Sequence, residues 1–162
     1  FGHPPNADAV MWFAKEIYPL ICRKVKMPFY IVGSSVTPEI EKLDGNGIIV
    51  KGFVSEEELA RLYDTCRLVV VPLRYGAGVK GKVVEALYYG TPMVTTSVGI
   101  EGIPDPEHYV RIADDPENFA NAVTEMYQNP KMLEQTVENY QKLVKENFSI
   151  DAVWNIVKED FE

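Results

Sequence analysis

The chain alternates between segments with two different spacings of apolar residues. Between residues 9 and 25 apolar residues recur every three or four positions, the spacing of one face of a helix. Pro4-Pro5-Asn6 precedes this segment and predicts a helix start with Asn6 as its cap. Residues 29–32 are continuously apolar and end at Gly33, a pattern that predicts a buried strand.

The same alternation continues along the rest of the chain. Ser55 followed by Glu58 forms a capping box that predicts a helix through Cys66, and Gly90 closes a helix that begins near residue 81. By the same criteria, further strands are expected at residues 48–50, 68–71, 92–96 and 109–112, and further helices at 37–43, 116–127, 130–147 and, capped by Ser149, through residue 161.

Strands that alternate with helices, each strand apolar throughout, indicate a parallel sheet covered on both faces. The sequence therefore predicts one α/β domain over residues 1–162, a doubly wound, Rossmann-like parallel sheet with helices on both sides.

The overall charge limits the possible partners. A net charge of −8 argues against nucleic acid as the main partner, so any bound phosphate must be held by a local cluster of cations. No apolar run approaches the roughly 18 residues of a membrane span. Two cysteines, Cys22 and Cys66, do not form a disulfide framework, and we expect structural thiols in a protein of the reducing cytoplasm.

The glycine-rich segment after the strand at residues 68–71 matches two phosphate-binding patterns incompletely. Residues 76–81 fit G-x-G-x-x-G, but they follow a middle strand, and the next strand ends in Thr95-Thr96-Ser97 without the acidic residue of a dehydrogenase. Residues 76–82 also fit the start of a P-loop, yet Val83 replaces the hydroxyl residue that holds magnesium.

The physical basis of both patterns still applies to this loop. Glycines let a backbone approach a ligand closely, and the first turn of the following helix presents unpaired N–H groups. Arg74, Lys80 and Lys82 add three nearby cations in a chain that is otherwise acidic. Together these features predict an anion site, most simply for a diphosphate, whereas the alternative is a surface loop with incidental lysines.

Glu85 follows the loop on the same predicted helix. It lies three residues after Lys82 and four after Gly81, on the face that points back toward the loop. A carboxylate beside a phosphate site suits the hydroxyl groups of a ribose. The alternative is a simple surface pair between Lys82 and Glu85.

Residues 78–94, which read GVKGKVVEALYYGTPMV, resemble the signature of group 1 glycosyltransferases (family 4, mostly retaining) with the GT-B fold. Shorter matches flank this segment at Pro5-Asn6, Val32-Gly33, residues 52–54 and residues 99–102. The resemblance spans essentially the whole chain and is to the C-terminal, nucleotide-sugar-binding domain of the family.

The resemblance implies roles for the loop residues. Glu85 corresponds to the second glutamate of the family's E-x7-E motif, which binds ribose, and the first, which contacts the donor sugar, is replaced by Ala77. Lys80 and Arg74 are the candidates for the basic pair that acts in catalysis. Backbone amides and neighbouring side chains are expected to bind the donor; these are Gly76, Ala77, Gly78, Val79, Lys82 and, at the edge of the pocket, His3.

The resemblance also implies the partners and the reaction. It implies a nucleoside-diphosphate sugar as donor for hexosyl transfer, and a glycan or lipid-linked acceptor held by an N-terminal domain absent from this chain. The absence of a D-x-D motif agrees with transfer that needs no metal, and no cofactor is expected. The isolated chain is therefore expected to bind a nucleotide without transferring sugar.

The resemblance implies that the chain starts just after the position of the family domain's first, central strand. We expect two neighbouring strands to lack a partner, with dimerisation, strand exchange or a rearranged sheet as the result. Two other functions stay open at this stage. They are one half of a nucleotide-sugar epimerase and a non-catalytic interaction domain of the same fold.

Overall fold

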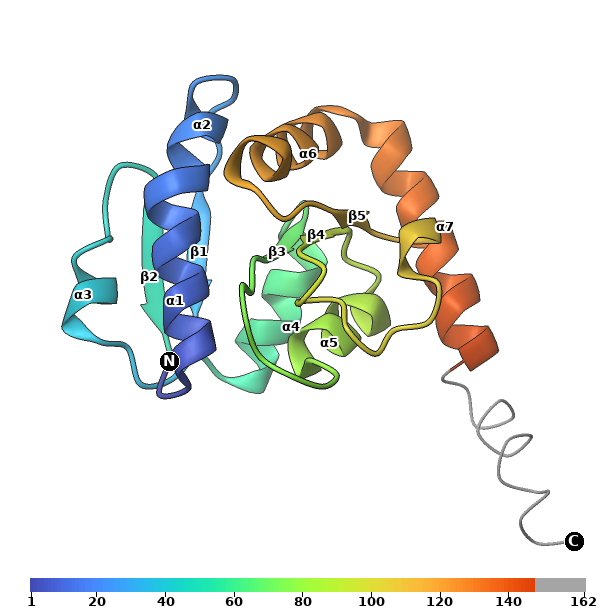
Figure 1. The fold of residues 1–162 in the computed structure, drawn as a ribbon, viewed down its shortest axis with the longest axis horizontal. Helices are drawn as coiled ribbons and strands as arrows, with labels where there is room; N and C mark the ends of the chain where they lie inside the picture. Colours follow the sequence, from blue (N-terminus) through green and yellow to red (C-terminus); the bar gives the residue numbers. More distant parts are fainter. Residues whose placement is uncertain (148–162) are drawn as a thin grey trace, which may run out of the picture.

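The computed structural model describes residues 1–147, in which short parallel strands alternate with helices (Figure 1). The elements, with π-helical η1 and 3-10 helical η2, are α1 (Pro4–Trp12), η1 (Phe13–Ile17), α2 (Tyr18–Cys22), β1 (Phe29–Val32), α3 (Pro38–Glu41), β2 (Ile48–Gly52), α4 (Glu56–Thr65), β3 (Val69–Val71), α5 (Gly81–Tyr89), β4 (Met93–Thr95), η2 (Pro106–His108), β5 (Arg111–Ile112), α6 (Pro116–Gln128) and α7 (Pro130–Asn147).

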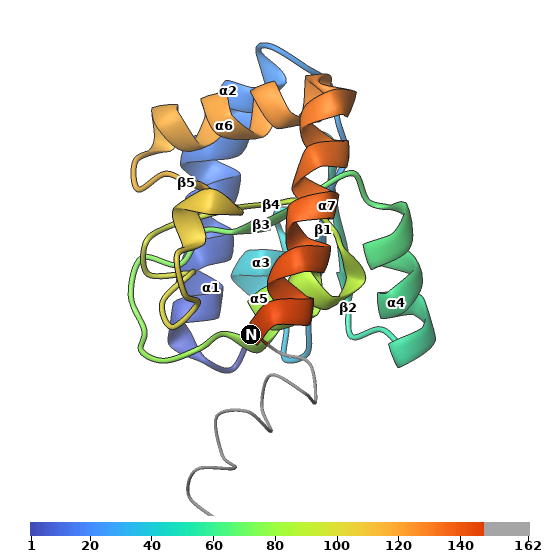
Figure 2. The same ribbon diagram turned by 90° about the vertical axis from the view of Figure 1, so that its right-hand side faces the viewer.

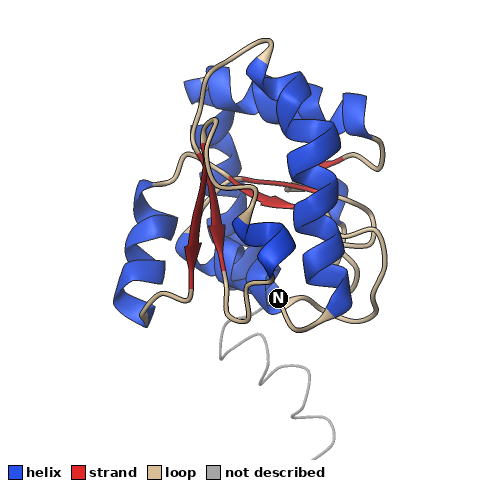
Figure 3. Cartoon of the chain, turned by 90° about the vertical axis from the view of Figure 1, so that its left-hand side faces the viewer, coloured by secondary structure: helices blue, strands red, loops and turns tan. Residues whose placement is uncertain are grey.

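The strands form two parallel sheets instead of the single sheet expected. β1 pairs with β2, and β3, β4 and β5 form a second sheet in that order. Within residues 1–147, β1 and β3 do not pair with each other, so each has one free edge (Figure 3). The predicted α/β class with parallel strands is confirmed, and the expectation of two strands without a partner agrees with this break.

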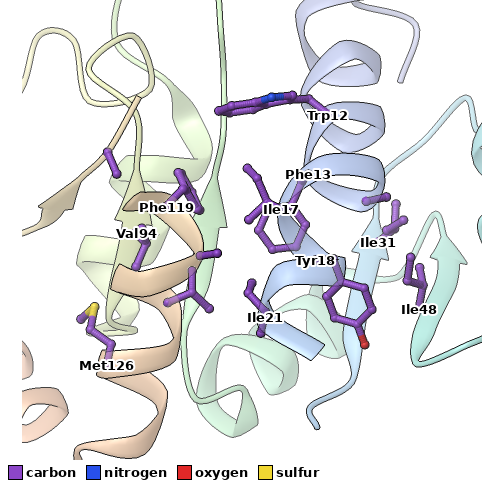
Figure 4. Packing of buried hydrophobic residues seen from close by; sticks show 14 of the residues in the cluster. Trp12, Phe13, Ile17, Tyr18, Ile21, Ile31, Ile48, Val94, Phe119 and Met126 are labelled. Atoms are coloured by element: carbon purple, nitrogen blue, oxygen red, sulfur yellow. The ribbon is translucent and has the colours of Figure 1, made fainter. Parts of the chain in front are cut away.

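Helices cover both faces of the strands, with α1 on one side and α4 on the other (Figure 2). One core lies under α1, η1 and α6, where the rings of Trp12 and Phe13 pack edge-on against Phe119 (Figure 4). The other core lies between α5, α7 and the strands, and in it the Met93 N–H of β4 donates a hydrogen bond to the hydroxyl of the buried Tyr140 of α7. These two cores fix the start of α5 relative to the start of α1.

The first helix begins earlier than its apolar spacing predicts. Pro4 and Pro5 occupy its first turn, where a missing N–H costs no hydrogen bond, and His3 takes the cap position predicted for Asn6. The Asn6 side chain is thereby free to contact another element. Further along, Pro19 has no N–H to donate, and the helix widens into the π-helical η1 just before it.

The predicted helix ends at the site are confirmed. The Glu58 N–H donates to the Ser55 side-chain oxygen at 3.2 Å, and Gly90 ends α5 with a left-handed φ of 71°. Cys22 and Cys66 are both free and half-buried. The helix predicted after Ser149 lies outside the described residues. No helix among residues 1–147 has the length and apolarity needed to cross a bilayer.

Candidate functional site

The loop of residues 72–80 joins β3 to α5 at the carboxyl end of the second sheet. Gly76 and Gly78 have φ values of 127° and 76°, which only glycine adopts without strain. α5 has no side-chain cap, and the backbone N–H groups of Gly81 and Lys82 find no acceptor among residues 1–147. The loop therefore opens onto the unpaired, positive end of a helix.

A cavity of about 270 Å³ lies against this loop and the start of α1. It brings together residues from two segments about seventy positions apart, namely His3, Pro5, Asn6, Leu73, Tyr75, Gly76, Ala77, Val79, Lys80, Gly81 and Lys82. Six residues proposed from the sequence are among them: His3, Gly76, Ala77, Val79, Lys80 and Lys82. Gly78 belongs to the same loop without lining the cavity, and Arg74 and Glu85 lie outside the lining.

Lys82 is a lysine of the cavity wall that has no acidic partner among residues 1–147. Its ammonium donates to the Asn6 side-chain oxygen at 2.6 Å, and it forms no ion pair within 4.0 Å in the described part of the chain. Burial lowers the pKa of Lys82, the Glu85 carboxylate opposes this shift, and the charge of Lys80 adds to it. A bound anion would relieve the cost of burying this charge.

Lys80 is held between two loops. Its side chain is 11% exposed and forms an ion pair with Glu101 at 3.3 Å, while the same ammonium donates to the Gly78 carbonyl. The loop that carries Glu101 packs closely against the glycine loop. A Cβ at Gly102 would lie only 2.6 Å from the Val79 side chain. Lys80 therefore joins the glycine loop to its neighbour, with part of its charge compensated.

The Arg74 side chain bonds to α1 and does not line the cavity. Its guanidinium makes two hydrogen bonds to Asp8, at 2.9 and 2.5 Å, and lies 5.4 Å from the centre of the Trp12 ring. The hydrogen bonds from Arg74 hold the pKa of the Asp8 carboxyl below its usual range. This arrangement ties the loop to the first helix. A direct contact between Arg74 and a phosphate stays a prediction.

Glu85 lies on the exposed surface of α5 and accepts a hydrogen bond from the Tyr63 hydroxyl of α4 at 3.0 Å. It forms no ion pair with Lys82 within the 4.0 Å limit in residues 1–147, so the simple surface pair considered above is not formed there. Glu85 lies three residues after Lys82 on α5, and its charge opposes the lowering of the Lys82 pKa.

Asn6, Tyr75, Glu101 and Tyr63 contact or line the site but were not proposed from the sequence as ligand-binding residues. Asn6 and Glu101 do lie within the short flanking matches to the glycosyltransferase pattern, which was the available clue. Among the described residues no group of three or more His, Cys, Asp or Glu is arranged to hold a metal ion. The site as built offers cations and N–H donors, the groups that bind an anion.

Residues 1–129 match the family model described as glycosyl transferases group 1, and the chain belongs to this family. An uncharacterised 44.6 kDa protein in the cps region of Klebsiella pneumoniae is 27% identical over 167 residues, which cover 97% of this chain and 43% of that protein.

Solved structures of the same fold include two longer enzymes. Sucrose-phosphate synthase from Thermosynechococcus elongatus has a TM-score of 0.73 at 19% identity, and S. aureus TarM, solved with UDP among its ligands, has 0.74 at 17%. Each match covers 94% of this chain, but only 41% and 32% of those proteins. The likeness confirms the α/β fold class, one Rossmann-like half of the GT-B architecture.

A third structure is itself an isolated domain. The C-terminal CMP-Kdo binding domain of WaaA from Acinetobacter baumannii has a TM-score of 0.53 at 16% identity, over 83% of this chain and 98% of that domain.

Proposed function

We propose that this chain is the donor-binding half of a glycosyltransferase and that its cavity holds the diphosphate of a nucleoside-diphosphate sugar. The observation that carries the proposal is the convergence of Lys80, Lys82 and the uncapped start of α5 on one cavity. Family membership supports glycosyl transfer as the reaction of the whole protein.

The chemistry of the cavity wall suits a diphosphate. Lys82 has a neutral amide as its partner, so its full charge is available to a phosphate oxygen. Lys80 can turn from Glu101 toward a second oxygen, and the N–H groups of Gly81 and Lys82 add donors aligned with the helix dipole. A nucleotide phosphate in this cavity can therefore contact positive charge and oriented N–H donors together.

Glu85 is proposed to bind the ribose of the same donor. It lies on α5 beyond Lys82, outside the phosphate cavity, and its carboxylate accepts hydrogen bonds but does not donate them. Ribose hydroxyls supply the matching donors. The nucleotide would thus run from the cavity along the surface of α5.

The donor sugar would lie at the opening formed by Ala77, Tyr75 and His3. Ala77 carries no polar side chain, so backbone amides of the loop and the side chains of Tyr75 and His3 are the groups that can meet sugar hydroxyls. The family carries a glutamate at the position of Ala77, so the polar groups offered to the sugar differ in this chain. The identity of the sugar is set by these few groups in our proposal.

Negative charge develops on the phosphate oxygens as the nucleoside diphosphate leaves the sugar. Preorganised lysines and N–H groups aimed at those oxygens stabilise that charge in the transition state. Lys80 and Lys82 fill this role in the proposal without a metal ion, while Arg74 holds α1 against the loop through Asp8. The acceptor would be a glycan or a lipid-linked sugar. The cps region named for the Klebsiella relative supports polysaccharide synthesis as the setting.

A nucleotide panel tests the proposal directly. The chain is heated with UDP, GDP, ADP or CMP, and CMP is included because of the CMP-Kdo binding domain of similar fold. At about one hundred times its Kd, one nucleotide should raise the Tm by roughly 5–10 °C. Lys80→Ala should lose most of that shift. No shift with any nucleotide or its sugar would instead support a non-catalytic interaction domain.

A further inference from the structure

Tyr63 is the side chain that fixes the Glu85 carboxylate in the ligand-free chain. Its hydroxyl donates to one Glu85 oxygen, Oε2, at 3.0 Å across the contact between α4 and α5. Burial raises the pKa of the Tyr63 phenol, and the Glu85 charge raises it further. The phenol is therefore a protonated donor throughout the neutral range.

The tyrosine is itself held by two further contacts. Its ring stacks on Tyr89 with centroids 4.9 Å apart and planes 7° from parallel, and its backbone carbonyl accepts a hydrogen bond from Thr91 at 2.9 Å. Tyr89 lies one helical turn beyond Glu85, farther from the uncapped start of α5. The Tyr63 ring thus packs beside a residue that lies beyond Glu85 from the start of α5.

From this geometry we infer that Tyr63 is a positioning residue, which holds the Glu85 carboxylate ready for the two ribose hydroxyls. The inference rests on the proposed function and adds to it the group that orients the ribose contact. An ionised carboxylate has about four acceptor positions, so one bond from Tyr63 leaves room for both hydroxyls of a diol. An exposed glutamate otherwise loses side-chain freedom when it binds, and a carboxylate already fixed loses less.

A purely structural role for Tyr63 would be to join α4 to α5. Such a role would affect every ligand alike, whether or not the ligand has ribose hydroxyls. The positioning role acts only through Glu85, so it affects only ligands that carry the diol. The two roles are therefore separated by a pair of nucleotides that differ in the 2′ and 3′ hydroxyls alone.

The experiment compares Tyr63→Phe with Tyr89→Phe. Tyr63→Phe keeps the ring stack and removes the hydrogen bond to Glu85, whereas Tyr89→Phe keeps the stack and removes a hydroxyl that bonds no group within residues 1–147. Calorimetric titration uses the nucleoside diphosphate that binds best among UDP, GDP and ADP, together with its 2′,3′-dideoxy form. Thermal melting confirms that each variant is folded.

We expect Tyr63→Phe to weaken binding of the ribonucleotide about three- to tenfold and to change binding of the dideoxy form less than twofold. Tyr89→Phe should change neither. Equal losses for the two nucleotides, or no loss for either, would overturn the positioning role while the proposed function stands. Failure of every nucleoside diphosphate to bind the unmodified chain would instead overturn the proposed function, and this inference with it.

Discussion

The Lys82 ammonium lies 2.6 Å from the side-chain oxygen of Asn6, so the first turns of α5 and α1 meet at one wall of the cavity. An amide oxygen accepts a hydrogen bond without cancelling the positive charge, which leaves Lys82 able to hold an anion. Burial disfavours the same charge and lowers the pKa of the ammonium. Lys82 is therefore well placed to bind an anion, but the burial of its charge lowers the stability of the folded chain.

Lys82→Met removes this charge and keeps much of the aliphatic length. We expect nucleotide affinity to fall about tenfold or more, because a hydrogen bond to a charged group contributes roughly 1.5–3 kcal/mol. The free energy of unfolding should stay level or rise, since the ammonium no longer has to be desolvated. Calorimetric titration and urea unfolding measure the two effects. Lys142→Met, exposed on α7, is the matched control. Unchanged affinity in Lys82→Met would remove this lysine from the site.

The lowered pKa of Lys82 also predicts the pH dependence of binding. A bound diphosphate favours the charged lysine, so affinity should be full below the Lys82 pKa and fall as pH rises through it. The free chain behaves in the opposite sense. Its unfolded state binds more protons between the lowered pKa and the usual one, so its stability rises with pH in that window.

Calorimetric titrations from about pH 8 to 11 follow this fall in nucleotide affinity. The charge of the phosphate is constant over this range, because its second ionisation lies near pH 6. In Lys82→Arg the fall should move to higher pH, because a guanidinium keeps its charge throughout this range. A curve that is identical in the two proteins would assign the titration to another group.

The element boundaries near the site follow from local chemistry that a sequence displays. Ser55 and Gly90 mark helix ends because their side-chain oxygen and their left-handed backbone act within one turn. The predicted start of the first helix was wrong. The prediction relied on apolar spacing, which begins only at residue 9, although Pro4 and Pro5 already fit the first turn of a helix. Local patterns therefore located the loop and α5 correctly.

The partners of the site residues could not be predicted in the same way. Lys82 meets Asn6, Lys80 meets Glu101, and Arg74 meets Asp8, all pairs that lie at least twenty residues apart. Each pair depends on how two elements pack and on the rotamers that result. The sequence indicated a cluster of three cations, whereas the structure shows that they have three different environments.

Arg74 and Asp8 should couple as a structural pair. Arg74→Met and Asp8→Asn should each lower the free energy of unfolding by about 0.5–1 kcal/mol, as expected for a partly exposed pair, and the double variant should lose little more. The pKa of Asp8 is lowered, so its contribution is present above the usual aspartate pKa and is lost as pH falls through the lowered value. Urea unfolding at several pH values measures this, with Glu134→Gln, exposed on α7, as a control.

Nucleotide affinity of Arg74→Met decides between anchoring and direct contact. Anchoring predicts a loss smaller than that of Lys82→Met. A tenfold or greater loss with an unchanged free energy of unfolding would place Arg74 on the phosphate, as the sequence suggested.

The Lys80–Glu101 ion pair should restrain binding of anions. Glu101→Gln releases Lys80, and we expect affinity for a nucleoside diphosphate to rise about two- to threefold at low salt, with a smaller gain at about 0.5 M salt. Glu107→Gln, an exposed residue in the same connection, should have no such effect. A fall in affinity with Glu101→Gln would show that this carboxylate contacts the ligand itself.

The central claim, that the β3–α5 loop and the start of α5 bind nucleotide phosphates, is tested most directly by amide NMR of the chain during titration with the nucleotide that stabilises it. The amides of Gly78, Gly81 and Lys82 should show the largest shifts, and those of α6 should hardly move. Largest shifts on α6 or on the exposed face of α7, with the loop amides unmoved, would contradict the account.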